Sequence, residues 1–110
     1  MGKNFLPIDT REALDTLFDD SKTHPVVVFK HSTSCGISAA AYREMEKFEG
    51  DVSLVVVQTA RDVSRELATI TGIRHESPQV IILRNGKAVW NASHYQIKAG
   101  AVAQATESVA

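Results

Sequence analysis

The chain contains a single cysteine, Cys35, and its surroundings favour thiol chemistry. A short apolar run precedes it, and a helix is predicted to begin at it. Free backbone N–H groups and the helix dipole at such a position stabilise a thiolate. The thiolate is the nucleophile in thiol–disulfide exchange. A lone cysteine is more often an inert buried residue, and the strand-to-helix position is the feature that favours a reactive thiol here.

Ser38 lies three residues after Cys35, on the same face of the predicted helix. In a two-cysteine redox motif, Cys-x-x-Cys, the resolving thiol occupies that place. A hydroxyl there can donate a hydrogen bond to the thiolate but cannot form a disulfide. We therefore predict that Cys35 and Ser38 are the catalytic residues of a one-thiol motif, whose second thiol comes from a partner or a small molecule.

The elements that position these residues are predicted from apolar periodicity and turn signals. In order they are a helix capped by Asp9 or Thr10, strand Val26–Phe29, a helix after Ser34 that ends at Gly50, strand Val52–Val57, helix Arg61–Thr71, strand Gln79–Leu83, strand Lys87–Asn91 and a helix capped by Ser93. A crossover helix makes the first two strands parallel, and the Asn85-Gly86 turn makes the last two antiparallel.

This order is that of a thioredoxin-like α/β sandwich of three layers, a four-stranded mixed sheet with helices on both faces. We expect residues 1–110 to form one such domain. Thioredoxin folds place a cis-proline before the third strand of this order, and Ser77-Pro78 stands there. That bond would turn the backbone of residue 77 toward an extended substrate. The expected substrate-binding residues around the thiol are Lys30, His31, Ser34, Gly36, Ser77, Pro78 and His94.

Composition excludes several classes of function. The formal net charge of −1, with 44% hydrophobic and 23% charged residues, describes a soluble globular protein without the basic surface that nucleic acid requires. No apolar run approaches the ~20 residues of a membrane span, and the N-terminus lacks the apolar core of a signal peptide. The 4 histidines are scattered, and one cysteine cannot form an internal disulfide. We expect a cytoplasmic protein without metal, membrane or nucleic-acid partners.

Short segments along the chain resemble the monothiol bacilliredoxins, also called bacillithiol-system redox-active proteins. The matching segments are Lys30-His31-Ser32, Cys35, Ile37-Ser38, Ala41-Tyr42, Val57-Gln58, Arg61-Asp62, Ser64, His75-Glu76-Ser77-Pro78-Gln79, Asn85-Gly86, Val89-Trp90-Asn91 and His94. The resemblance implies a thioredoxin-like fold and a cysteine that removes bacillithiol from modified proteins. One departure is Gly36, because the family usually has proline directly after the cysteine.

The sequence therefore predicts a thiol–disulfide oxidoreductase that takes a low-molecular-weight thiol, bacillithiol or a similar one, from S-thiolated cytoplasmic proteins. The small thiol is a co-substrate, and no tightly bound cofactor is expected. Two alternatives stay open. One is a thioredoxin-fold adaptor that uses Cys35 as a redox sensor. The other is an iron–sulfur carrier, because Cys35-Gly36-Ile37-Ser38 is similar to the Cys-Gly-Phe-Ser of monothiol glutaredoxins. The absence of the glutaredoxin Thr-Val-Pro and Gly-Gly stretches ranks cluster binding below thiol exchange.

Overall fold

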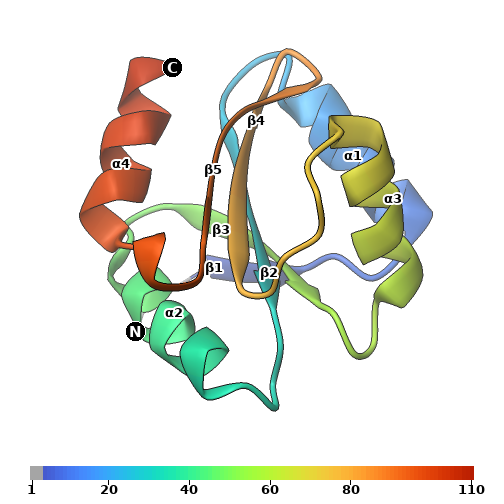
Figure 1. The fold of residues 1–110 in the computed structure, drawn as a ribbon. Helices are drawn as coiled ribbons and strands as arrows, with labels where there is room; N and C mark the ends of the chain where they lie inside the picture. The colour runs from blue at the N-terminus through green and yellow to red at the C-terminus, as the bar shows by residue number, and fades with distance from the viewer. Residues whose placement is uncertain (1–3) are drawn as a thin grey trace.

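A five-stranded mixed sheet lies between two pairs of helices in the computed structural model, which describes residues 4–110 (Figure 1). Helices α1 and α3 cover one face of the sheet, and α2 and α4 cover the other. The elements are β1 (Asn4–Pro7), α1 (Arg11–Asp20), β2 (Val26–His31), α2 (Gly36–Lys47), β3 (Asp51–Val56), α3 (Arg61–Thr71), β4 (Gln79–Arg84), β5 (Lys87–Ser93), the 3₁₀ turn η1 (His94–Gln96) and α4 (Ala99–Ser108).

The strand order is β1-β3-β2-β4-β5, with β1, β3 and β2 parallel and β4 and β5 antiparallel to their neighbours. The central strand β2 is buried on both faces, which explains its continuous apolar run. Asn85 and Gly86 have φ of 56° and 76°, the left-handed pair that a type I′ hairpin turn requires. A register shift between Ile82 and Leu83 leaves one extra residue on β5.

The predicted thioredoxin-like sandwich is confirmed, with one strand more than the sequence predicted. The additional strand is β1, which pairs in parallel with β3 at the edge of the sheet. It is only 4 residues long and ends in Pro7, so it lacks the periodicity that reveals a strand. An edge position tolerates proline, because the missing N–H is not needed by a second neighbour. The ladder continues through the amide of Ile8, which donates to the carbonyl of Leu54 at 2.8 Å.

Each face of the sheet packs its own apolar core. The core under α2 and α4 is built around Val27, Phe29, Met45, Val80, Ile82 and Val102. The core under α1 and α3 is built around Leu14, Val28, Val55, Leu67, Ile81 and Leu83. Alternate residues of β2 therefore face opposite cores, as the two-residue period of a strand requires. The same alternation places Lys30 and His31, at the end of β2, on opposite faces of the sheet.

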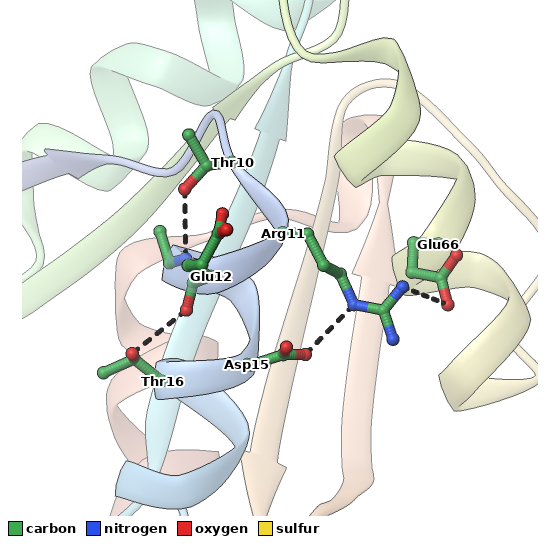
Figure 2. Close-up of polar contacts among 7 residues, drawn as sticks. Thr10, Arg11, Glu12, Asp15, Thr16 and Glu66 are labelled. Carbon is green, nitrogen blue, oxygen red and sulfur yellow. Dashed lines mark hydrogen bonds and ion pairs between the residues drawn. The ribbon is translucent and has the colours of Figure 1, made fainter.

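Polar contacts join α1 to α3 on the outer surface (Figure 2). Thr10 caps α1, because its side chain accepts a hydrogen bond from the amide of Ala13 at 3.1 Å. Arg11 lies between Asp15 and Glu66, with its guanidinium 3.1 Å from a carboxylate oxygen of each. Such exposed pairs contribute little to stability. They do orient the side chain of Glu66, which points from α3 toward α1.

The C-terminal helix begins later than the sequence predicted. Ser93 and Gln96 do form the expected capping box, but it begins only the turn η1. His94 has a left-handed φ of 54°, and Ile97 returns to extended backbone with its side chain in the core. The helix α4 then begins at Ala99. Burial of Ile97 takes precedence over continuing the helix from Ser93.

Candidate active site

Cys35 is the N-cap residue of α2, at the end of the sheet where β2 and β3 finish and β4 begins (Figure 1). Its backbone is extended, with φ −115° and ψ 128°, and its carbonyl accepts from the amide of Ala39 at 3.0 Å. Its side chain is only partly buried and makes no capping hydrogen bond. The cysteine is therefore partly exposed and begins the first helical turn, whose amides have no partner within the helix, as the sequence predicted.

Ser38 is fully buried in the first turn of α2 and connects the helix to the loop before the cysteine. Its Oγ accepts from the amide of Ser32 at 2.9 Å and lies 2.8 Å from Nδ1 of His31. The hydroxyl has one proton, which goes to His31 when that ring nitrogen is bare. When Nδ1 carries its own proton, the hydroxyl proton is free for another acceptor. Ser38 therefore fixes the loop as well as occupying the resolving position of the motif.

His31 faces the α2 side of the sheet. Its ring lies 4.9 Å from that of Tyr42 and 5.5 Å from that of Phe29, between ring centroids. Burial lowers the pKa of His31, and the hydrogen bond with Ser38 partly opposes this. A neutral imidazole near pH 7 is the form that can accept the proton of the Ser38 hydroxyl. The structure thus brings two of the sequence-predicted site residues into direct contact.

Gln58, which sequence reasoning did not select as a site residue, holds the loop that leads to the thiol. Its Oε1 accepts from the amide of Thr33 at 3.2 Å, and its Nε2 donates to the hydroxyls of Ser32 at 2.9 Å and Ser34 at 3.1 Å. The hydroxyl of Ser34, a predicted substrate contact, is therefore occupied by a neighbour within the protein. The sequence did contain a signal for this role, because Gln58 is a polar residue directly after a buried strand, at the end of the sheet that carries the cysteine.

Lys30 lies on the opposite face of the sheet from His31, under α3, and its side chain is 0% exposed. Its Nζ donates to the carbonyl of Ser64 at 3.4 Å, and no carboxylate among residues 4–110 pairs with it. Burial lowers its pKa to about 8. The sequence placed Lys30 among the substrate contacts, whereas the structure gives it no exposed surface with which to touch a substrate.

The Ser77-Pro78 peptide bond is cis, as the sequence predicted. The carbonyl of Pro78 accepts from the amide of His94 at 3.0 Å, so the segment before β4 is joined to the end of β5. Nε2 of His94 also lies 3.5 Å from a carboxylate oxygen of Glu76. Gln79, which follows Pro78, pairs with Lys30 near the end of β2 and with Ser93, the residue before His94. Ser77, Pro78 and His94 therefore lie at the end of the sheet where β2 leads to Cys35 and α2.

Gly36 opens α2 with its Cα facing open space. An ideal Cβ at this position meets nothing within 4 Å. The first helical position also accepts proline well, because its N–H has no partner within the helix. The glycine at position 36 is therefore not required by any close contact at its Cβ position in this structure.

Within residues 4–110, no three His, Cys, Asp or Glu side chains are grouped so that they could share a metal ion. None of the helices in the same part of the chain combines the length and apolar character needed to cross a membrane.

Comparison with known proteins agrees with this geometry. The model of the family described as monothiol bacilliredoxin BrxC matches residues 6–102. A solved structure described as a candidate oxidoreductase with a thioredoxin fold is 35% identical, with a TM-score of 0.83, over 91% of this chain and 91% of that one.

Thioredoxins share the fold at lower identity. That of Fasciola hepatica is 15% identical with a TM-score of 0.75, over 96% of this chain and 100% of the thioredoxin. That of Trypanosoma brucei brucei is 17% identical with a TM-score of 0.77, over 99% of this chain and 93% of the thioredoxin. The fold, the single accessible thiol and the family match together identify a thioredoxin-fold protein with a thiol redox role, and the chain belongs to the monothiol bacilliredoxin BrxC family.

Proposed function

We propose that the protein is a monothiol thiol–disulfide oxidoreductase that removes a low-molecular-weight thiol from mixed disulfides on proteins. The small thiol that we propose is bacillithiol. The observation that carries this proposal is the single accessible thiol at the N-cap of α2, with a serine at the resolving position. The small thiol serves as a co-substrate, and the S-thiolated protein is the partner.

The reaction consists of two exchanges. The Cys35 thiolate attacks the sulfur of the small thiol, so a new disulfide forms at Cys35 while the old one breaks. The substrate cysteine leaves with the electron pair and takes up a proton. Because Ser38 cannot resolve the adduct, it persists until a second small thiol attacks it. That attack releases a disulfide of two small thiols and restores Cys35.

Two features support this cycle over a simple redox sensor. The loop before Cys35 is held by Gln58 and Ser38, so the thiol is positioned before any substrate arrives. The cis Ser77-Pro78 segment lies at the same end of the sheet. Extended backbone at such a segment can pair with a substrate chain.

The test is turnover on a protein that carries a single bacillithiol adduct, followed by intact mass. We expect the adduct to leave the substrate, appear on Cys35 and disappear again when free bacillithiol is added. The Cys35→Ser variant is the control and should leave the substrate modified. An adduct that moves to Cys35 but stays there when free bacillithiol is added would instead identify a sensor, and the oxidoreductase proposal would fail.

A further inference from the structure

A pocket of about 380 Å³ adjoins the loop that carries the thiol. One face of α3 forms a wall, at the i, i+3, i+4, i+7 spacing of a helix. The remaining lining comes from the end of β3 and from the segment before the cis-proline. The lining residues are Val57, Gln58, Arg61, Ser64, Arg65, Ala68 and His75.

Gln58 connects this pocket to the thiol. It lines the pocket, and its amide nitrogen also donates to the hydroxyl of Ser34, the residue next to Cys35. His75 connects the pocket to the other side of the site, because it lies two residues before Ser77 in the segment that leads to the cis bond. A molecule whose sulfur meets Cys35 would therefore have this pocket within reach of its other groups.

The charged residues that line the pocket are basic. Arg61 makes no ion pair within residues 4–110, and Arg65 only approaches the exposed Asp62, at 3.9 Å. Glu66 is on the same helix but points to Arg11 of α1, away from this wall (Figure 2). The wall therefore presents Arg61, which has no ion pair among the described residues, and Arg65, whose one ion pair is long and exposed. Arginine is well suited to bind carboxylates.

Buried polar groups lie beneath the same wall. The ammonium of Lys30 has one hydrogen bond, to the carbonyl of Ser64, whose Oγ in turn lies 3.3 Å from Nδ1 of His75. Gln79 is the cross-strand partner of Lys30, is 1% exposed, and has no partner for its Oε1 among the described residues. Partial burial, and then the charge of Lys30, lower the pKa of His75, while Glu76 opposes this.

A buried ammonium without a counter-charge is costly in a folded protein. Residues 4–110 supply no carboxylate to Lys30, although the ammonium lies one residue below the pocket wall. An anion held by Arg61 and Arg65 would supply part of that missing counter-charge. The pocket and the buried ammonium are separate observations, and both favour an anionic ligand.

We propose, on the basis of the proposed function, that the pocket walled by Arg61 and Arg65 binds the carboxylate groups of the low-molecular-weight thiol. Held there, the small thiol presents its own sulfur to Cys35, and the sulfur of the substrate protein points outward. Attack then forms the bond between Cys35 and the small thiol, breaks the mixed disulfide, and releases the substrate cysteine as a thiolate. The pocket thus determines which of the two sulfurs is attacked.

The experiment measures the rate of adduct formation on Cys35 by quenched intact mass with three probes. They are bacillithiol disulfide, which carries carboxylates, the neutral 2-hydroxyethyl disulfide, and the cationic cystamine. We expect Arg61→Gln combined with Arg65→Gln to slow the bacillithiol reaction by about tenfold, equivalent to about 1.4 kcal/mol, and to leave the neutral reaction unchanged. Both arginines are exposed, so the variant should fold.

Arg43→Gln is the matched control, because Arg43 lines a separate groove between α2 and η1 that includes His94. We expect it to leave the ratio of the bacillithiol rate to the neutral rate unchanged. A ratio that falls in Arg43→Gln, or that is unchanged in the double variant, would overturn the proposal. A double variant that is slowed equally on the cationic cystamine would overturn it too, because the loss would not depend on the carboxylates of the small thiol.

A binding measurement separates this inference from the proposed function. In the Cys35→Ser variant, bacillithiol disulfide should shift the NMR signals of the Arg61 and Arg65 side chains and the His75 ring. Shifts there without turnover in the wild-type protein would support the pocket and refute the oxidoreductase cycle. Turnover without those shifts would support the cycle and refute the pocket.

Discussion

Replacing Lys30 by methionine is expected to stabilise the protein. The ammonium is 0% exposed and has one hydrogen bond, 3.4 Å from the carbonyl of Ser64. Burial lowers its pKa from 10.5 to about 8. At about 1.4 kcal/mol for each pH unit, that difference corresponds to roughly 3 kcal/mol of destabilisation while the lysine is charged. Methionine fills a similar volume without a charge, but it loses the hydrogen bond, so we expect a net gain of about 1–3 kcal/mol at pH 7.

The same lysine makes the wild-type stability depend on pH. Below about pH 8 it is protonated in both the folded and the unfolded chain, and the full penalty applies. Between about pH 8 and 10.5 the folded chain loses this proton while the unfolded chain keeps it, so the free energy of unfolding rises with pH. Above 10.5 both states are neutral and the penalty is gone. In Lys30→Met this rise should be absent.

Urea unfolding of both proteins from pH 6.5 to 10 measures the effect, and the difference between them cancels the titration of other groups. The exposed Lys87 provides the control, since Lys87→Met removes a lysine that is not buried. A Lys30→Met protein that is less stable than wild type, with a parallel pH profile, would refute the reasoning. It would mean that the folded protein already compensates the charge.

Four further predictions concern the loop and the first turn of α2. Ser38→Ala should lower the free energy of unfolding, measured with urea, by about 1–3 kcal/mol, because the amide of Ser32 loses its acceptor. Ser38→Cys should form a disulfide with Cys35 on oxidation. If alkylation and mass instead detect two free thiols in the oxidised variant, the i, i+3 geometry is contradicted. Gln58→Ala should increase hydrogen exchange at the amide of Thr33 and slow adduct formation on Cys35 several-fold, whereas an unchanged exchange rate would show that Gln58 does not hold the loop. Gly36→Pro should raise the free energy of unfolding by about 0.4–1 kcal/mol, because proline restricts the unfolded chain and a Cβ at this position meets nothing within 4 Å; a destabilised variant would show that this helix start is strained.

Most of the fold follows from local patterns in the sequence. Helix α3 was predicted with its observed bounds, Arg61–Thr71, because its apolar stripe ends at a glycine. Gly72 there has a φ of 72°, as a helix C-cap often requires. Strand β1 was missed because its four residues become a strand only by pairing with β3. Short edge strands depend on tertiary contacts that no local pattern records.

The site was predictable only in part, for a similar reason. Cys35 and the cis Ser77-Pro78 bond follow from position in the chain once the order of elements is known. The direction of the Lys30 side chain does not follow from its position in the chain, because a lysine at the end of a buried strand can point either to solvent or under a helix. The sequence places Arg61 only at the start of a predicted helix, and its place on a pocket wall with His75 appears only when α3 packs beside the segment before β4.

The register shift in the β4–β5 hairpin affects how well this edge of the sheet could pair with a second chain. Strand β5 is an edge of the sheet, and edges offer unpaired N–H and C=O groups to other chains. Because Ile82 pairs with Trp90 and Leu83 pairs with Ala88, Val89 is the extra residue, and it is 44% exposed. A bulge of this kind twists the strand and disturbs the even spacing that a second strand needs. An apolar residue can therefore remain exposed at this edge without making β5 a good template for aggregation.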